Sequence, residues 1–335
     1  MKHMYKLLFT TTMMMGTMIA ISSNSWISMW IGLEINLLSI IPLMSNIKNK
    51  MESEAAMKYF ITQAMASTIF MLAIIIMLSN NDIMTSMKMS SAILDLAILT
   101  KMGAAPFHFW FPEVMEGLSW TNSMIMLTWQ KIAPMVIFSY SIKSIMLMIW
   151  IIISSMMVSG LMGINQTSMR KILTYSSINH IGWMIAAMMT NQSLWIIYFA
   201  IYSLMTINIT MMFKMMNIFY MNQLVNSMNK SKTIKIMFSL NFLSLGGIPP
   251  FIGFFPKWIT INSLIQENMY SLTLIMILMT LMTLVFYMRI NLTSGIMPTT
   301  ESTNMKTMNI SNNLIISNFI TISFLSMGPM MINFI

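Results

Sequence analysis

Residues 101–112, KMGAAPFHFWFP, and residues 245–258, LGGIPPFIGFFPKW, are the two stretches that decide the fold of this chain. Both combine proline, which removes a backbone donor and clashes with the preceding turn, with glycine, which permits an unwound backbone. Both lie inside long apolar segments and hold a lysine. We therefore expect two broken helices, interrupted at residues 103–106 and 246–250, and backbone that lines a polar pathway.

The composition around these stretches is that of an integral membrane protein. The chain has 335 residues, of which 57% are hydrophobic and 8% charged, whereas about a quarter of the residues in soluble domains are charged. Strand-length segments with regular alternation are missing, which favours an all-α fold. Apolar runs of about 20 residues, each long enough to span a bilayer as a helix, predict a single polytopic domain over residues 1–335 with eleven transmembrane helices. These are expected at residues 7–23, 26–45, 54–78, 91–111, 121–141, 144–163, 170–189, 193–213, 234–262, 270–290 and 313–334.

The basic residues are distributed unevenly between the two sides of the predicted bundle. The net charge is +9, with 18 basic residues. Thirteen fall on the side of the N-terminus: Lys2, Lys6, Lys48, Lys50, Lys58, Arg170, Lys171, Lys214, Lys230, Lys232, Lys235, Arg289 and Lys306. Lys88 and Lys143 fall on the other side, and Lys101, Lys131 and Lys257 lie within predicted spans. This asymmetry places the N-terminus on the positive-inside face and the C-terminus opposite, and it argues against nucleic-acid binding.

Four charges inside predicted spans are the candidate functional residues: Glu34, Lys101, Lys131 and Lys257. A charge at mid-bilayer costs roughly 3 kcal/mol on insertion scales, and such residues usually mark ion or proton pathways. We expect Glu34 and Lys101 to approach within about 6 Å, because an opposite charge keeps a buried group ionised. Lysine suits a relay because burial readily moves its pKa. For Lys257, near the end of its broken helix, snorkelling to the interface is the alternative.

Lys131 is expected near the bilayer centre, between Lys101 and Lys257, with polar side chains or water linking the three. Gln130 and the carbonyls freed by Pro134 are suitable partners for its ammonium.

Two histidines in the predicted spans, His108 and His180, are further relay candidates. Together they could also ligate a haem, but intramembrane histidines more often make polar contacts. The chain has no cysteine, which excludes thiolate-held iron–sulfur clusters and disulfides. The sequence predicts no metal and no cofactor site.

Six sequence blocks together resemble subunit 2 of the mitochondrial NADH dehydrogenase family. They are residues 30–36 (WIGLEIN), 103–112 (GAAPFHFWFP), 128–134 (TWQKIAP), 165–171 (NQTSMRK), 176–183 (SSINHIGW) and 243–258 (LSLGGIPPFIGFFPKW). The resemblance covers essentially the whole chain. With 49 methionines, the sequence looks like an insect or related arthropod member.

This resemblance implies an antiporter-like, proton-translocating subunit of respiratory complex I in the mitochondrial inner membrane. It implies inverted repeats, with the N-terminus in the matrix and the C-terminus in the intermembrane space. The first half-channel would cover residues 7–141, the second residues 144–290, and the C-terminal helix residues 313–334.

Carried over by position, Glu34 and Lys101 resemble the glutamate–lysine pair of the first half-channel. Lys131 resembles the central relay lysine and Lys257 the lysine of the second half. His108 and His180 fall at polar axis positions, whereas Asp95 is not part of the family pattern.

The resemblance also implies that NADH, FMN, iron–sulfur clusters and ubiquinone are held by other subunits. The expected partners are the other membrane and peripheral-arm subunits of complex I, and lipids. Two other functions fit the same architecture: a stand-alone cation/proton antiporter, and a structural membrane subunit whose charges have lost their function.

Overall fold

The computed structural model describes residues 4–46, 49–79, 84–141, 144–228, 232–296 and 318. Its described part contains fourteen α-helices. The only β-type pairing among these residues is an isolated antiparallel bridge between Ser168 and Tyr220. The expectation of an all-α chain is therefore confirmed for the described residues.

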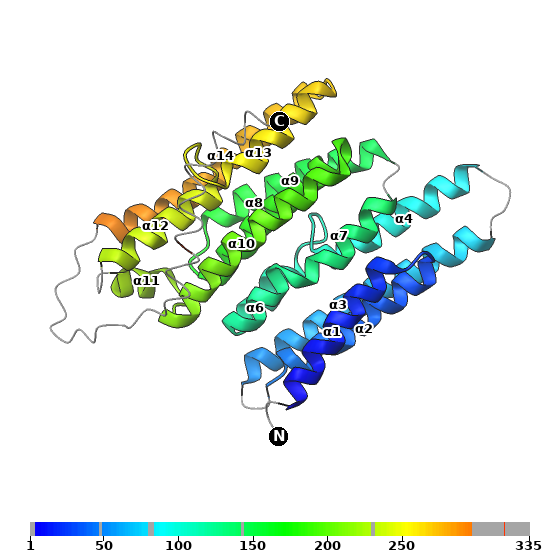
Figure 1. Cartoon of the computed structure of the whole chain (residues 1–335), viewed down its shortest axis with the longest axis horizontal. Helices are drawn as coiled ribbons and strands as arrows, with labels where there is room; N and C mark the ends of the chain where they lie inside the picture. The colour runs from blue at the N-terminus through cyan, green and yellow to red at the C-terminus, as the bar shows by residue number, and fades with distance from the viewer. Residues whose placement is uncertain are drawn as a thin grey trace. The chain divides into compact units, whose positions relative to one another are not determined.

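The chain divides into two compact units, Met1–Ile151 and Ile152–Ile335. In the first unit, coloured blue to green in Figure 1, α1 packs on α2, α3 packs on α2, α4 and α5, and α7 packs on α4, α1 and α6. The helices of this unit are α1 (Met4–Ser22), α2 (Trp26–Met44), α3 (Lys50–Ser79), α4 (Met84–Met102), α5 (Trp110–Gly117), α6 (Trp120–Leu127) and α7 (Trp129–Ser141). Helix α8 (Ile145–Ile164) contains the boundary between the units.

The second unit is built around α9, which packs against α10, α13 and α14. Its residues 172–188 are all buried. The unit comprises α9 (Met169–Thr190), α10 (Gln192–Met216), α11 (Met221–Met228), α12 (Lys232–Gly246), α13 (Phe254–Gln266) and α14 (Tyr270–Ile296). Because α9 also carries Ser176, Ser177, Asn179 and His180, the core of this unit contains a row of buried polar groups.

The segment predicted as one helix over residues 121–141 is instead two helices, α6 and α7, that meet at Thr128. The Thr128 hydroxyl donates to the Met124 carbonyl at 2.7 Å, a type of bond that often bends helices. Pro134 lies inside α7. Of the span predicted over residues 313–334, only Asn318 lies among the described residues.

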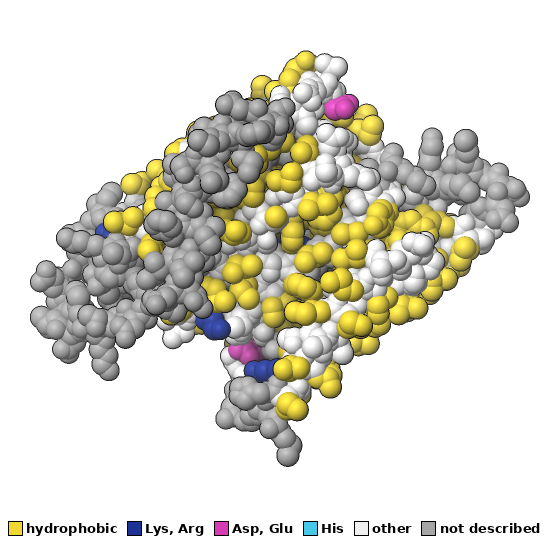
Figure 2. Space-filling model, in the orientation of Figure 1, with side chains coloured by type: hydrophobic (Ala, Val, Ile, Leu, Met, Phe, Trp, Pro, Cys, Tyr) yellow, Lys and Arg dark blue, Asp and Glu magenta, His cyan; other side chains and the backbone are white. Residues whose placement is uncertain are grey.

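The exposed surface of the helices is apolar, as expected for a membrane protein. Six helices of the described part, α1, α2, α3, α8, α10 and α14, are long and apolar enough to cross a bilayer. Several large hydrophobic side chains are mostly exposed, including Met146 and Trp150 on α8 and Leu7 on α1. In Figure 2 hydrophobic side chains cover much of the visible described surface, and charged side chains appear at isolated points. Soluble monomers rarely expose apolar patches of this extent.

Helices α1 and α2 approach closely because glycine faces the contact from both sides. A Cβ on Gly32 of α2 would lie 2.5 Å from the backbone nitrogen of Ala20 in α1. A Cβ on Gly16 of α1 would lie 2.9 Å from the backbone nitrogen of Asn36 in α2. Small residues are the usual means of bringing membrane helices together. This contact fixes α2, which carries Glu34.

We predict that Gly32→Ala destabilises the chain by about 1–3 kcal/mol, because the added methyl must push two backbones apart. The control is Gly160→Ala, whose Cβ would meet the Met282 side chain at 3.3 Å and the Met279 carbonyl oxygen at 3.7 Å. The midpoint of thermal unfolding in detergent should fall clearly for Gly32→Ala and little for the control. Equal midpoints for the two variants would show that the α1–α2 contact is not tight.

Candidate functional site

Glu34 and Lys101 form an ion pair between α2 and α4. The Lys101 Nζ lies 3.5 Å from the Glu34 Oε1, which confirms the predicted approach. The lysine side chain is 4% exposed and the glutamate side chain 23% exposed. Charge-assisted N–H···O bonds are typically about 2.7–2.9 Å long, so this contact is loose. The exposed pair of Lys58 and Glu113, at 2.7 Å, is tighter.

Lys101 lies in the last turn of α4, and the residue that ends this helix is Gly103. The φ of Gly103 is +74°, and its N–H donates to the Leu99 carbonyl at 3.1 Å, as does the N–H of Ala104. The indole of Trp110 donates to the Thr100 carbonyl at 3.0 Å. A helix C-terminus carries partial negative charge and attracts cations. Lys101 therefore lies where α4 ends, and the negative group that its ammonium contacts is the Glu34 carboxylate.

Lys131 lies one turn into α7 and is 2% exposed. Its ammonium lies 5.6 Å from the centre of the Phe111 ring, within range of a cation–π contact. The backbone N–H of Lys131 donates to the carbonyl of Thr128, three residues earlier, at 3.3 Å, directly after the junction of α6 and α7. The prediction that Lys131 is buried is confirmed.

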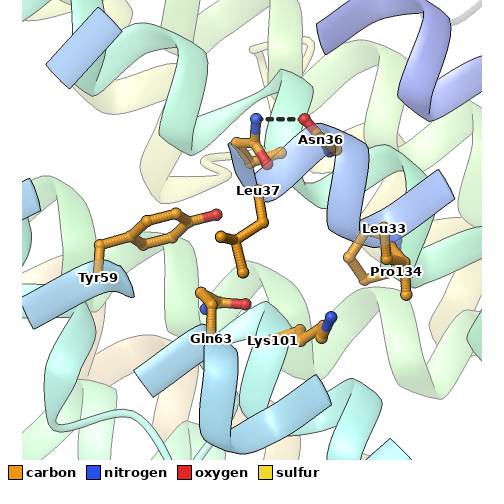
Figure 3. Close-up of a pocket in the computed structure, with 8 residues that line it drawn as sticks. Leu33, Asn36, Leu37, Tyr59, Gln63, Lys101 and Pro134 are labelled. Carbon is orange, nitrogen blue, oxygen red and sulfur yellow. Dashed lines mark hydrogen bonds between the residues drawn. The ribbon is translucent and has the colours of Figure 1, made fainter. Parts of the chain in front are cut away.

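A polar cavity lies beside the Glu34–Lys101 pair (Figure 3). About 20 Å³ of it is open to the centre of a water molecule. A polar cavity of about 10–15 Å³ on this measure can hold one water. Across the cavity, the Gln130 amide donates to the Asn36 Oδ1 at 2.9 Å. The wall is contributed by α2, α3, α4 and α7, through Leu33, Asn36, Leu37, Tyr59, Gln63, Lys101, Gln130 and Pro134.

A second cavity, of about 10 Å³ on the same measure, is lined by both Lys101 and Lys131. It shares Tyr59, Lys101 and Gln130 with the first cavity. Its other lining residues are Met102, Trp110, Phe111, Met126 and Lys131. The first unit therefore joins Glu34, Lys101 and Lys131 through polar side chains and small cavities.

Lys257 belongs to the second unit, where its partner is a backbone carbonyl. It is 5% exposed, and its Nζ donates to the Gly246 carbonyl at 2.9 Å. Gly246 is the last residue of α12, and Lys257 lies in the first turns of α13. The ammonium thus lies across the interruption and neutralises the negative end of α12. This buried contact argues against the alternative that the Lys257 side chain extends to the membrane interface.

The gap between α4 and α5 and the gap between α12 and α13 begin with similar backbones. Like Gly103, Gly247 has a positive φ, of +79°, and its N–H donates to the Leu243 carbonyl, as does that of Ile248. Helical structure stops at Met102 and resumes at Trp110, and it stops at Gly246 and resumes at Phe254. Each gap follows the same order of glycine, proline and aromatic residues.

The two histidines are buried in different units and bond to protein oxygens. The Nδ1 of His108 lies 3.2 Å from the Pro106 carbonyl within the first interruption. The Nδ1 of His180 lies 2.8 Å from the Tyr198 hydroxyl, and its ring packs on Tyr202. Among the described residues, no group of three or more His, Cys, Asp or Glu is arranged to hold a metal.

Three residues that contribute to the site were missed by sequence reasoning: Tyr59, Gln63 and Tyr198. Gln63 gives the clearest signal, because it is an amide in the middle of an otherwise apolar span. The pattern of this one helix does not show which neighbouring helix the Gln63 side chain faces. Asp95, which the family pattern did not explain, is buried on α4.

The comparisons with known proteins agree with this geometry. Residues 23–283 match the family model described as NADH:quinone oxidoreductase/Mrp antiporter, TM. NADH-ubiquinone oxidoreductase chain 2 of Anopheles gambiae is 46% identical, covering 98% of both chains. The protein of the same name from Locusta migratoria is 48% identical, covering 87% of this chain and 86% of the relative.

Solved structures with the same fold come from larger membrane assemblies. A chain of respiratory complex I from Thermus thermophilus has a TM-score of 0.86 at 20% identity, covering 96% of this chain and 78% of that one. A chain of the Mrp complex from Dietzia has a TM-score of 0.74 at 14% identity, covering 89% of this chain and 62% of that one. The family match and the two insect relatives together establish the assignment: this chain belongs to the NADH-ubiquinone oxidoreductase chain 2 family.

Proposed function

We propose that this chain is a proton-translocating, antiporter-like subunit of respiratory complex I, in which Glu34, Lys101, Lys131 and Lys257 carry the proton. The observation that supports this most directly is the connected set of buried charges in the first unit. A loose ion pair, at 3.5 Å, adjoins a polar cavity, and a second cavity continues from Lys101 to Lys131.

Within this pathway Glu34 exchanges protons with the surface and Lys101 with the interior. Glu34 is the more exposed member of the pair, at 23%, and Lys101 the more buried, at 4%. When the pair is closed, the carboxylate holds the ammonium charged. When it opens, the ammonium faces the cavity and can release its proton toward Lys131. In the second unit, Lys257 and His180 are proposed to continue the pathway.

The proposed topology is that of eleven spans with the N-terminus in the matrix and the C-terminus in the intermembrane space. Helices α4 with α5, α6 with α7, and α12 with α13 would each form one interrupted span. With the seven longer helices α1, α2, α3, α8, α9, α10 and α14, these give ten spans, and residues 313–334 would supply the eleventh. Residues 7–141 and 144–290 are proposed as the two half-channels, related as inverted repeats, because the backbones that follow α4 and α12 are similar.

The chain would act in the mitochondrial inner membrane, in contact with lipids and with other membrane and peripheral-arm subunits. NADH, FMN, the iron–sulfur clusters and ubiquinone would be bound by those subunits. This chain would contribute residues for proton transfer to an NADH:ubiquinone reductase and no redox centre. A stand-alone cation/proton antiporter would use the same residues, and activity of the isolated chain in vesicles would favour it.

The Glu34→Gln variant tests the ion pair. We predict that it assembles but pumps protons at least about tenfold more slowly, since the amide keeps the shape and cannot hold the charged state of Lys101. Glu113→Gln, which removes the exposed carboxylate beside Lys58, is the control and should pump normally. The measurement is the rate of proton uptake per assembled complex in vesicles, and equal rates for both variants would contradict the assignment.

The Lys131→Met and Lys131→Arg variants test the central relay. Methionine keeps much of the apolar stem and lacks the titrating ammonium, and arginine cannot release its proton in this range. Both variants should assemble in near-normal amounts and fail to pump. A normal proton-to-electron ratio in the methionine variant would make Lys131 a structural charge.

The Gly247→Ala variant tests the anchor of Lys257. A Cβ at this position would lie 2.8 Å from the Lys257 Nζ, on a backbone whose φ is +79°. We predict a loss of about 1–2 kcal/mol from the left-handed backbone and displacement of the ammonium from the Gly246 carbonyl, with loss of pumping. Gly246→Ala, whose Cβ would lie 3.6 Å from the nearest side chain, is the matched control and should keep the contact. Normal pumping by Gly247→Ala would show that the carbonyl anchor is dispensable.

A further inference from the structure

We infer that Gln63 is a positioning residue that, with Tyr59, holds one water against Lys101 in the first cavity, at the start of the step toward Lys131. This inference rests on the proposed function and adds a specific site to it. Neither residue carries a charge, and neither belongs to the sequence blocks on which the family resemblance stands.

The Gln63 amide is buried on α3 and is not fully hydrogen-bonded. Gln63 is 4% exposed, and its Nε2 is buried without a hydrogen-bond partner. Nearly all buried polar groups in proteins are satisfied by protein or by ordered water. Gln63 lines the cavity beside Lys101, and Figure 3 draws its amide oxygen toward that cavity. A water there would donate to this oxygen, and rotation of the amide about its last bond would let Nε2 donate to the same water.

The second argument is the arrangement of the other polar groups on the same cavity. Tyr59 and Gln63 are four residues apart on α3 and therefore share one face of that helix. Figure 3 draws the Tyr59 hydroxyl, the Gln63 amide and the Lys101 ammonium around the same cavity. Ordered buried waters typically make about three hydrogen bonds. Gln63, Tyr59 and Lys101 supply that number.

The third argument is the position of this water on the pathway. Tyr59, Lys101 and Gln130 line both cavities, and Lys131 lines the second. The Lys101–Glu34 contact of 3.5 Å leaves the ammonium able to turn toward the water. One N–H bond of the ammonium then breaks as the water oxygen takes the proton. This water passes one of its protons to a second water in the cavity that Lys131 lines, and the Lys131 amine takes a proton from that second water, so that both waters are restored.

The test uses the assembled complex and compares Gln63→Met, Gln63→Glu and Tyr59→Phe with the unaltered chain. Methionine keeps the unbranched shape without a polar end, and glutamate keeps a group that can bind water. The control is Ser67→Ala, one turn further along α3, where the hydroxyl bonds only to the Ala64 carbonyl and lines neither cavity.

For Gln63→Met and Tyr59→Phe we expect proton transfer per assembled complex to fall by about tenfold, as for the loss of one hydrogen bond of about 1.4 kcal/mol. The solvent deuterium isotope effect on pumping should rise, because proton transfer becomes rate-limiting. Gln63→Glu should keep most of the rate, and Ser67→Ala all of it. A role confined to packing would lower the amount of complex but leave the rate per complex and the isotope effect unchanged, which would overturn the inference.

A structure of the unaltered complex that resolves waters decides the question even where a variant fails to assemble. We expect one ordered water within hydrogen-bonding distance of Gln63 and Tyr59, and a dry cavity would overturn the inference. Normal pumping by Gln63→Met alongside a silent Lys131→Met would reject the role of Gln63 and leave the proposed function standing. Normal pumping by Lys131→Met would reject the proposed function itself.

Discussion

A buried ammonium needs a source of negative charge, and the structure around the three buried lysines is arranged to supply one. Lys101 has the Glu34 carboxylate at 3.5 Å, and Lys257 has the Gly246 carbonyl at 2.9 Å. Lys131 faces the Phe111 ring at 5.6 Å. The three contacts are thus with a full charge, a carbonyl dipole and an aromatic face.

The helix interruptions follow from the same requirement. A continuous helix uses its carbonyls internally and has none to offer in the middle of a membrane. Ending α12 at Gly246 leaves a carbonyl that accepts from the Lys257 ammonium. At the end of α4, the Leu99 and Thr100 carbonyls accept from Gly103, Ala104 and Trp110. Gly103 and Gly247 make these ends possible, because both adopt a positive φ that other residues rarely tolerate. The two breaks differ in where the lysine lies: Lys101 precedes its glycine, whereas Lys257 reaches back across the gap from α13.

Much of this could be predicted from the sequence because the determinants are local or strongly constrained. Hydropathy alone placed most of the helices, and the scarcity of charges inside apolar segments made Glu34 and Lys101 obvious partners. The junction at Thr128 was missed because threonine tolerates both a continuous and a bent helix, and the sequence alone does not show that its hydroxyl bonds the Met124 carbonyl. Gln63 and Tyr59 were missed for another reason. Their role depends on the cavity that four helices enclose together, which no single helical pattern encodes.

The central claim is that the Glu34–Lys101 pair opens and closes as protons pass, and infrared difference spectroscopy of the assembled complex tests it most directly. Spectra with and without NADH-driven turnover should differ by a protonated carboxyl band that shifts with isotopic labelling of glutamate and is absent when Glu34 is replaced. The account predicts that this band appears during turnover. A carboxylate at Glu34 that stays ionised in the resting and turning-over complex alike, while protons are pumped, would contradict it.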